Sequence, residues 1–354
     1  MPEKRAKGSP VGLAACSVPC GGRCARLDVA QQNLDASRTV LRPVEIPAQA
    51  QNNDWMVTWT ADSQSVVVWG RKAGLHRAYA ASDLGRSVPL PQEAQKGESV
   101  DSVVGVQGGE IALLTDNGTL ARIDATRGTV LTQPFPAHPG PNSNGPLGDL
   151  FTYGQLMARP GHPGQVAVVT RAGGGRGEIM LWDVRTPVQV AMLTGPAIGV
   201  PYTENSLGSG LVFSPDGSRL AVQNHDGQVR VWDVDRRERL PEEVPRPTGS
   251  HLIGFAPDGR LVTYLGGLIR VHDLADGSTV SLAVAEEAAE EVTDTTAQLT
   301  TDHQLVIDNG VGRRAFDLRA EAQFRTLCAG AARDYTEDER EQLPKGTPPE
   351  PPCA

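Results

Sequence analysis

The sequence predicts an all-β fold assembled from repeated small antiparallel sheets, on the basis of three observations. Residues 211–240 alternate apolar and polar side chains with the period of two typical of strands, for example at Leu211 and Phe213. Turn-forming residues such as Ser214-Pro215-Asp216-Gly217 separate these apolar runs. A residue pair that ends in Asp recurs roughly every 40 to 60 residues, close to the period of propeller blades. A single unit cannot bury both of its faces, so the copies must pack against one another.

The best-preserved unit, 211–240, predicts four strands in order. The apolar pairs Leu211/Phe213, Leu220/Val222 and Val229/Val231 mark the first three. The turn 214–217 connects the first two strands, and Asp226-Gly227 is the hairpin signal between the second and third. The third strand ends at Trp232-Asp233, and a fourth follows it.

Weaker copies of this unit occur along most of the chain. The strand-end pair recurs as Leu27-Asp28, Tyr79-Ala80, Ile123-Asp124, Trp182-Asp183, His272-Asp273 and Phe316-Asp317. The first turn recurs as Ala256-Pro257-Asp258-Gly259, and in eroded form as Thr60-Ala61-Asp62-Ser63 and Thr300-Thr301-Asp302-His303. We therefore expect one antiparallel sheet for each strand-end pair.

With these turns and strand ends, residues 25–327 resemble the WD40-repeat family. The resemblance implies a WD40-like β-propeller with six recognisable blades and a partial N-terminal one, which makes a seven-bladed ring. Its structural motif residues are Asp226, Trp232, Asp233, Trp182 and Asp183. The family's Gly-His step is mostly missing, and Gly249-Ser250-His251 is its nearest relic. The resemblance therefore implies the blade-pinning hydrogen-bonded tetrad only around Asp226 and Trp232.

Three segments are expected: an irregular N-terminus at 1–23, the propeller at 24–327 and a C-terminal extension at 328–354. Because 24–44 look like the third and fourth strands of a blade, the chain is expected to open partway through one. In the extension, 335–343 predict a short helix with Thr336 as N-cap, Glu339 completing a capping box and Pro344 as the stop. The extension resembles that of actinobacterial WD40 proteins, in which the propeller often serves as a sensor behind an effector domain.

Charge and cysteine content narrow the class of protein. The net charge of -9 argues against a nucleic-acid partner, and no apolar run reaches the roughly 18 residues of a membrane span. Cys16, Cys20 and Cys24 have no nearby fourth ligand for a metal site, although Leu13-Ala14-Ala15-Cys16 resembles a lipoprotein cleavage box with a short apolar region. A Cys328–Cys353 disulfide stays open. We expect a cytoplasmic bacterial protein without a membrane partner.

Catalytic motifs are not found. The sequence has no G-x-S-x-G elbow, H-E-x-x-H helix or Walker loop, and its seven histidines lack metal-ligand spacing. The glycine run 173–177 precedes a strand, so it predicts a hairpin turn instead of a phosphate loop. We therefore predict a non-enzyme with no catalytic residue, no metal and no cofactor.

Binding is then the expected activity. The connectors 134–149, 195–209 and 285–294 are long, and long loops in compact domains often carry function. The first two flank one blade, so Phe135, His138, Tyr202 and Glu204 are the candidate partner-binding residues. We predict a scaffold or sensor module that binds a protein or peptide on the propeller rim, with a small-molecule ligand also open. The alternatives are a propeller enzyme with a channel active site, of lactonase or peptidase-associated type, and a secreted or lipid-anchored binding protein.

Overall fold

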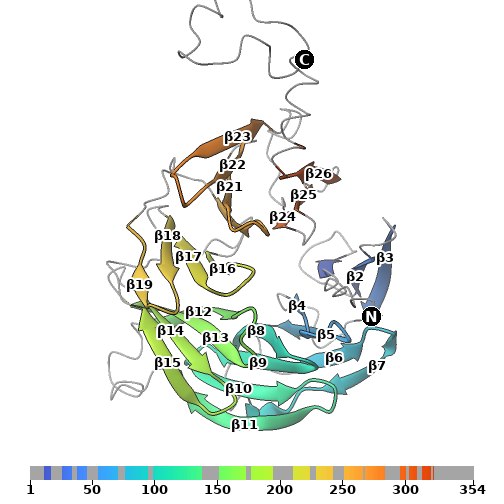
Figure 1. The fold of residues 1–354 in the computed structure, drawn as a ribbon. Helices are drawn as coiled ribbons and strands as arrows, with labels where there is room; N and C mark the ends of the chain where they lie inside the picture. Colours follow the sequence, from blue (N-terminus) through green and yellow to red (C-terminus); the bar gives the residue numbers. More distant parts are fainter. Residues whose placement is uncertain are drawn as a thin grey trace, which may run out of the picture.

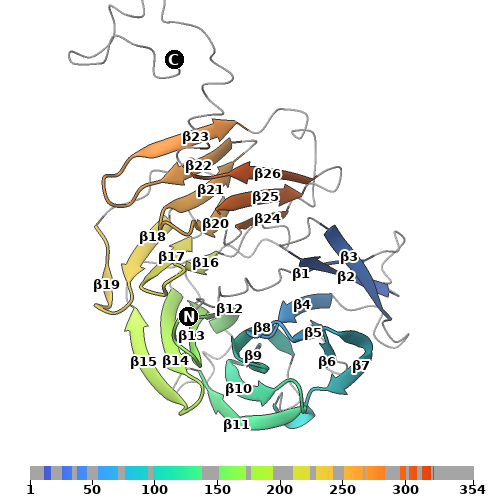
Figure 2. The same ribbon diagram turned by 45° about the vertical axis from the view of Figure 1, so that its right-hand side comes forward.

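A computed structural model describes most of the chain as a series of antiparallel sheets. The described residues are 12–16, 26–33, 38–45, 55–70, 76–94, 99–137, 151–172, 177–193, 210–223, 229–241, 251–265, 268–283, 296–299, 303–308, 313–319 and 322. Their strands form seven sheets, five of four strands and two of three. Numbered in chain order, sheets 1 to 7 follow one another around a centre, as Figures 1 and 2 show.

The first four sheets contain fifteen strands. Sheet 1 holds β1 (Gly12–Cys16), β2 (Arg26–Asn33) and β3 (Arg38–Glu45). Sheet 2 holds β4 (Trp55–Trp59), β5 (Ser65–Gly70), β6 (Arg77–Ala80) and β7 (Asp83–Pro89), and the short 3-10 helix η2 (Gln92–Ala94) follows it. Sheet 3 holds β8 (Val100–Gln107), β9 (Glu110–Thr115), β10 (Thr119–Asp124) and β11 (Thr129–Pro136). Sheet 4 holds β12 (Phe151–Ala158), β13 (Gln165–Ala172), β14 (Gly177–Asp183) and β15 (Val188–Leu193).

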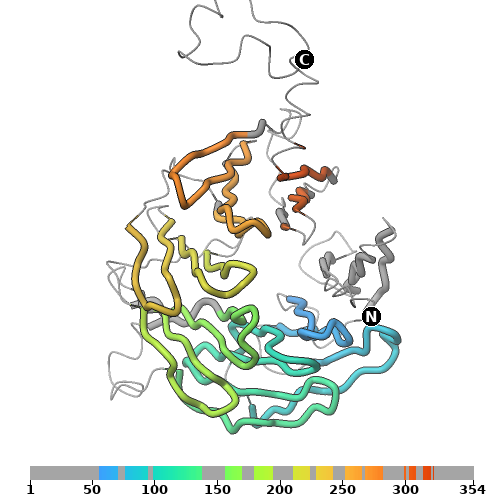
Figure 3. Tube along the Cα trace, in the orientation of Figure 1, coloured from blue at the N-terminus to red at the C-terminus, as the bar shows by residue number. Residues whose placement is uncertain are grey.

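The remaining three sheets contain eleven strands. Sheet 5 holds β16 (Leu211–Phe213), β17 (Arg219–Gln223), β18 (Val229–Asp233) and β19 (Glu238–Arg239). Sheet 6 holds β20 (His251–Phe255), β21 (Leu261–Leu265), β22 (Leu268–His272) and β23 (Thr279–Ala283). Sheet 7 holds β24 (Thr296–Leu299), β25 (Gln304–Asp308) and β26 (Arg313–Asp317). The first strands of consecutive sheets lie next to each other from β1 to β24, as the coloured trace in Figure 3 shows for the sheets after the first.

The four strands predicted in 211–240 are confirmed as β16 to β19, each antiparallel to the next. In every unit from Tyr79-Ala80 onward, the predicted strand-end pair lies at the end of the third strand of its sheet or spans that end. Strands β13 and β14, which flank the glycine-rich residues 173–176, pair antiparallel, and a hairpin turn between them stays a prediction. The described strands form seven sheets, and the number of blades and the closure of the ring between sheets 7 and 1 stay predictions.

The recurring Asp at the third strand's end has a local physical reason. In sheet 4 the Asp183 Oδ1 accepts the backbone N–H of Arg185 at 2.9 Å, and in sheet 5 Asp233 accepts that of Arg236 at 2.9 Å. Asp317 repeats the bond with Arg319 at 3.0 Å. In sheets 4 and 5 the carboxylate thus fixes the turn into the fourth strand, as Asp and Asn do in turns of this kind. The Arg185 guanidinium also lowers the pKa of Asp183, chiefly by hydrogen bonding to its carboxylate.

The eroded first turn of sheet 2 has the same geometry as the well-preserved one of sheet 5. Thr60 Oγ1 donates to Asp62 Oδ1 at 2.7 Å, just as Ser214 Oγ donates to Asp216 Oδ1 at 2.6 Å. Ser63 takes the left-handed conformation, with a φ of 59°. A hydroxyl at the first position and a carboxylate at the third are therefore enough to form this turn, even without Pro and Gly.

The core lies between consecutive sheets, and sheets 3 to 6 each bury both of their faces. On β14, Ile179 and Leu181 pack toward sheet 5, whereas Met180 and Trp182 pack toward sheet 3. This alternation follows from the strand's period of two, since successive side chains point to opposite faces. The near-continuous apolar sequence of the middle strands is the expected signature of strands buried on both faces.

Trp232 packs across the gap to the preceding sheet, as its position on β18 predicts. It is 1% exposed and lies in one cluster with Ile179 and Leu181 of sheet 4, whereas Val229 and Val231 pack toward sheet 6. The expected tetrad is not formed at this indole: its N–H is buried without a hydrogen-bond partner. Asp226, the other tetrad residue, lies outside the described residues. In sheet 6 the ring of His272 at the same position bonds the Thr263 hydroxyl, whereas sheet 5 has Val222 in place of that threonine.

Two expectations for the N-terminal region are wrong. Residues 12–16, placed in an irregular N-terminus, form β1, which pairs antiparallel with β2. Leu27-Asp28 lies near the start of β2 and not at its end, so it is no strand-end marker. The alternation continues past Asp28 through Val29, which lets the strand extend to Asn33. The strands expected at 25–29 and 39–41 are present as β2 and β3, and β3 lies next to the outermost strand β7 of sheet 2. The helix at 335–343, the cysteines of the extension and the acidic connector at 285–294 lie outside the described residues.

His76, which precedes β6, makes stability depend on pH. The side chain is buried, neither ring nitrogen has a hydrogen-bond partner, and burial lowers the pKa of His76 to about 4. The unfolded chain therefore binds a proton on this residue from about pH 6.5 downward, whereas the folded chain binds it only near pH 4. We expect the free energy of unfolding to fall through this window with a slope that approaches about 1.4 kcal/mol per pH unit. Denaturant unfolding of the wild type and His76→Leu from pH 7 to 4 checks this, because the variant lacks the slope.

Candidate functional site

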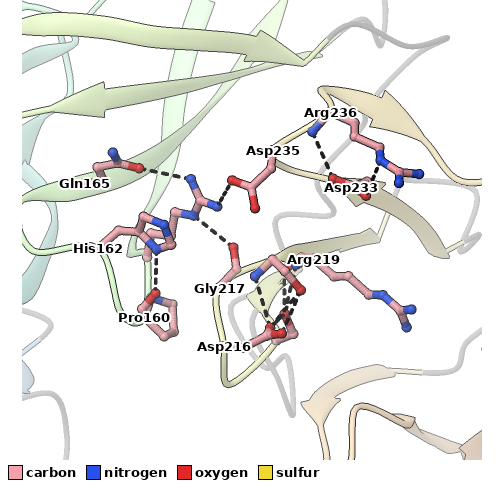
Figure 4. Close-up of polar contacts among 12 residues, drawn as sticks. Pro160, His162, Gln165, Asp216, Gly217, Arg219, Asp233, Asp235 and Arg236 are labelled. Carbon is pink, nitrogen blue, oxygen red and sulfur yellow. Dashed lines mark hydrogen bonds and ion pairs between the residues drawn. The ribbon is translucent and has the colours of Figure 1, made fainter.

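The turns between first and second strands and those between third and fourth strands lie on one edge of the sheets, because successive strands run in opposite directions. We call this edge the turn rim. Its described turns are 60–64, 81–82, 108–109, 125–128, 159–164, 184–187, 214–218, 234–237, 256–260 and 273–278. Buried and exposed charges meet on this rim between sheets 4 and 5, and Figure 4 shows this region. We examine it as the candidate site.

Arg159 links the two sheets from a buried position. Its side chain is only 4% exposed and donates three hydrogen bonds, drawn in Figure 4. Nε donates to the Gly217 carbonyl at 2.8 Å and Nη1 to Gln165 Oε1 at 3.1 Å. Nη2 donates to Asp235 Oδ1 at 2.5 Å, and this Asp side chain is 64% exposed. One guanidinium thus joins the turn 159–164 to both rim turns of sheet 5.

The local sequence positions Arg159 and Gln165 side by side. The turn between them contains Gly161 and Gly164, which adopt φ values of 70° and 77° that only glycine takes without strain. The Arg159 N–H donates to the Gln165 carbonyl at 2.9 Å, so the two residues close the turn as a pair. A hydrogen bond of 3.0 Å between His162 Nδ1 and the Pro160 carbonyl holds the imidazole at the tip.

The receiving turn in sheet 5 is fixed by its own side chains. Asp216 accepts the Ser214 hydroxyl at 2.6 Å and the Ser218 N–H at 3.0 Å. The Ser214 hydroxyl bond is the largest of several that together lower the pKa of Asp216 to about 2. The carboxylate is therefore ionised at all physiological pH values, and it is exposed on the rim.

Gly217 lets the two sheets approach closely. Its φ is 71°, and a Cβ added there would lie 2.3 Å from the Pro160 carbonyl oxygen of sheet 4. Gly217→Ala therefore combines a left-handed alanine with a backbone clash, and we expect a loss of about 2 kcal/mol in the free energy of unfolding.

The matched control for this prediction is Gly259→Ala. Gly259 has the same turn position in sheet 6 and a φ of 85°, but nothing lies within 4 Å of its added Cβ. Thermal or denaturant unfolding of the two variants separates the conformational cost from the clash. Equal losses would show that the close approach at Gly217 contributes nothing.

Exposed charges of both signs surround this anchored frame. Asp235 and Arg236 are 64% and 77% exposed at the side chain, and Arg237 beside them is also exposed. Arg236 lies 3.7 Å from Asp233, which caps the same turn. Residues 236–238 are all exposed on the rim. These groups can form ion pairs and bidentate hydrogen bonds with a partner.

Among the described residues, no group of three His, Cys, Asp or Glu side chains is placed to hold a metal ion. No described helix is long and apolar enough to cross a membrane.

The structure describes only one of the four residues predicted as partner-binding. Phe135 belongs to strand β11 and is half-buried, with its ring 5.3 Å from that of Trp182, so its assignment to a loop is wrong. The strand extends to Pro136 because Phe135 pairs with Leu120 of β10 and buries its ring in the interface between sheets 3 and 4. His138, Tyr202 and Glu204 lie outside the described residues. The motif residues Trp182, Asp183, Trp232 and Asp233 all end third strands, as expected.

Arg159 is the functional residue that sequence reasoning missed. Its partners Gly217 and Asp235 lie 58 and 76 residues farther along the chain, so no local pattern indicates the contact. A usable signal is that Arg159 is the first residue of the rim turn 159–164 of sheet 4.

Antiparallel sheets in series, buried on both faces in sheets 3 to 6, are the architecture of a WD40-type β-propeller. The solved structure of the WD40 β-propeller domain of Doa1 has this fold: it aligns with a TM-score of 0.54 over 89% of this chain and 91% of that one, at 11% identity. No family model matches the chain.

Two curated proteins are similar over part of the sequence. Periodic tryptophan protein 2 homolog from Schizosaccharomyces pombe is 32% identical over 107 residues, which are 30% of this chain and 12% of that protein. Actin-interacting protein 1 from Drosophila melanogaster is 27% identical over 94 residues, or 26% of this chain and 16% of that protein. The chain thus matches less than a fifth of the length of either relative, and the WD40-repeat resemblance expected from the sequence is supported.

Proposed function

We propose that this chain is a non-enzymatic protein-interaction module whose turn rim binds a protein or peptide partner. The observation that carries the proposal is the frame between sheets 4 and 5, where the buried Arg159 holds two rim turns in place beneath exposed charges. A fixed backbone with exposed ionised side chains loses little entropy when a partner binds, which favours recognition. The name Actin-interacting protein 1 supports an interaction role by analogy.

The same proposal covers the finer expectations from the sequence. We propose a cytoplasmic, bacterial protein in which the propeller serves as a sensor or scaffold, as the resemblance of the C-terminal extension implies. A binding contribution from the connectors with His138, Tyr202 and Glu204 is part of this proposal. Genomic sequence upstream of Met1 tests the sensor arrangement, because it shows whether an effector domain belongs to the same protein.

The test of the rim uses the full chain as bait, with cross-linking and quantitative mass spectrometry of extracts from its host. A partner of the rim is expected to be enriched by the wild type and lost with Arg236→Glu/Arg237→Glu. Arg127→Glu is the matched control, because Arg127 is a 78% exposed arginine on the turn rim of sheet 3. Capture that is unchanged in the double variant, or equally reduced by Arg127→Glu, would contradict a site between sheets 4 and 5. Melting curves confirm that all variants are folded.

A further inference from the structure

Two arginines lie on the turn rim of sheet 5 beside the joint with sheet 6. Arg219 begins β17 two residues before Ala221, which packs toward sheet 6. Asp233 ends β18 two residues after Val231, which packs the same way. Arg219 and Asp233 therefore share this face, on which they are paired in register. Arg236 follows in the turn, with its Nε 3.7 Å from the Asp233 carboxylate. Figure 4 shows the Arg219 and Arg236 side chains extending away from sheet 4, and we call them the arginine pair.

The rim joints on either side of this one are bridged by arginines. Arg159 joins sheet 4 to sheet 5, and Arg260 Nη2 donates to the Leu318 carbonyl of sheet 7 at 2.6 Å. Arg219 closes its turn as Arg260 does, because the Ser214 N–H donates to the Arg219 carbonyl at 2.9 Å. Among the described residues, however, the Arg219 guanidinium has no hydrogen-bond or ion-pair partner. Its N–H donors therefore remain available at the joint between sheets 5 and 6.

Three carboxylates of the adjoining rim turns do not serve these donors. Asp235 accepts the Arg159 guanidinium of sheet 4. Asp258 of sheet 6 accepts an arginine that reaches toward sheet 7. Asp273 lies two residues after Val271, which packs toward sheet 7, so it continues that face of sheet 6. These acids thus belong to the joints on either side of the arginine pair.

Four further carboxylates lie on the same rim turns or beside them. Asp216 and Asp276 each accept a backbone N–H of their own turn. Asp233, which adjoins both arginines, does the same. Glu238 is exposed and lies opposite Asp233 on β19, two strands or about 10 Å from Arg219. Of these four carboxylates, only that of Glu238 has no hydrogen bond in the structure, and it lies on the outer strand.

We propose that the arginine pair binds an acidic segment of a protein partner through the partner's carboxylates. This proposal rests on the proposed function, because it names the chemistry of the partner at the turn rim. A guanidinium binds a carboxylate with two parallel N–H···O bonds. Arg219 is half-buried, so its stem has less rotamer freedom to lose on binding. The partner's carboxylate takes the place that the Leu318 carbonyl takes for Arg260.

Asp233 favours carboxylates over phosphate groups as the bound anion. A phosphate monoester carries a charge of about −1.5 to −2 at pH 7, whereas a carboxylate carries a single charge. The Asp233 carboxylate adjoins both arginines, so it repels the more highly charged phosphate more strongly. An acidic protein segment is therefore the expected partner, and a phosphorylated segment is the alternative that the experiment distinguishes.

The experiment measures binding of a fluorescein-labelled hexaglutamate peptide to the full chain by fluorescence anisotropy, at an ionic strength of about 20 mM. The wild type is expected to bind, and Arg219→Glu to weaken binding roughly tenfold, because like charges then meet. Arg219→Gln removes the charge without adding one and is expected to weaken binding about threefold. Glu238→Gln is expected to tighten binding about twofold, because it removes an exposed carboxylate on the same face.

Three controls accompany these variants. Hexaglutamine keeps hydrogen-bonding side chains without the charge and is expected not to bind. A phosphoserine peptide of the same net charge as hexaglutamate is expected to bind more weakly. Arg127→Glu, which changes a 78% exposed arginine on the turn rim of sheet 3, is expected to leave binding unchanged. Melting curves show whether each variant is folded, and Arg219→Gln carries the test if Arg219→Glu is not.

The proposal is overturned if the wild type does not bind hexaglutamate, or if the folded Arg219 variants bind it as well as the wild type. Equal binding of hexaglutamine, an equal loss in Arg127→Glu or tighter binding of the phosphoserine peptide overturns it as well. Failure of the proposed function is a separate result. A partner captured from extracts through Arg236 and Arg237, together with unchanged binding by Arg219→Glu, leaves that function standing and overturns the acidic partner alone.

Discussion

Replacing Trp232 with Ala is expected to lower the free energy of unfolding by about 3–5 kcal/mol, one of the largest effects of any single substitution in this chain. The indole is 1% exposed and packs with residues of two sheets, among them Leu220 of its own sheet and Ile179 of sheet 4. Truncation leaves a cavity between the sheets that neither can fill without moving the other. Denaturant unfolding monitored by circular dichroism gives the value, and a change in melting temperature below a degree or two would refute the packing role.

Trp232→Phe is the matched control for this cavity. The Trp232 N–H is buried without a partner, and such a group costs about 1–3 kcal/mol relative to water. Phenylalanine removes this unsatisfied donor and keeps most of the ring volume. We therefore expect Phe to restore more than half of the stability lost in Trp232→Ala. A phenylalanine variant as unstable as the alanine variant would show that the N–H makes a favourable contact.

Arg159→Leu is expected to lower the free energy of unfolding by about 3 kcal/mol, because a buried charge with three acceptors is lost. The Gly217 carbonyl is then left buried without its donor, whereas Asp235 can turn to water since its side chain is 64% exposed. Because Asp235 is exposed, the expected loss lies at the lower end of the range for broken buried ion pairs. Denaturant unfolding at neutral pH measures the change.

Two further variants separate the contributions of the Asp235 charge and of guanidinium burial to the stability loss. Asp235→Asn keeps an acceptor and removes the charge, and we expect a loss below about 1 kcal/mol because the pair is partly exposed to solvent. Arg260→Leu removes a similar bridge, in which Arg260 Nη2 donates to the Leu318 carbonyl of sheet 7 at 2.6 Å, but from a side chain that is 17% exposed. A loss for Arg260→Leu as large as for Arg159→Leu would show that burial of the guanidinium does not set the cost.

The repeating part of the fold could be predicted from the sequence because its causes are local. Alternation in β17 and β18 fixes which side chains face sheets 4 and 6, since a strand has a period of two. The Asp at the end of a third strand bonds backbone groups two or three residues ahead, as at Asp183 and Asp233. Such contacts recur wherever the same residues recur, so their spacing is visible in the sequence.

The candidate site could not be predicted in the same way. Arg159 acts on Gly217 and Asp235, which belong to another sheet, and no spacing rule connects them. Phe135 falls within the predicted connector 134–149, but its contact with Trp182 of the next sheet holds it in a strand. In both cases the deciding contact joins two sheets.

The sequence by itself determined the all-β repeat architecture, the positions of the third strands and the turns that end them. These features follow from the period of two in strands and from hydrogen bonds between residues a few positions apart, and both are visible in the sequence. Only the tertiary structure decided that Arg159 joins sheets 4 and 5 and that Gly217 is required by a neighbouring carbonyl. Each of these contacts joins residues of different sheets, so it depends on how whole sheets pack against one another.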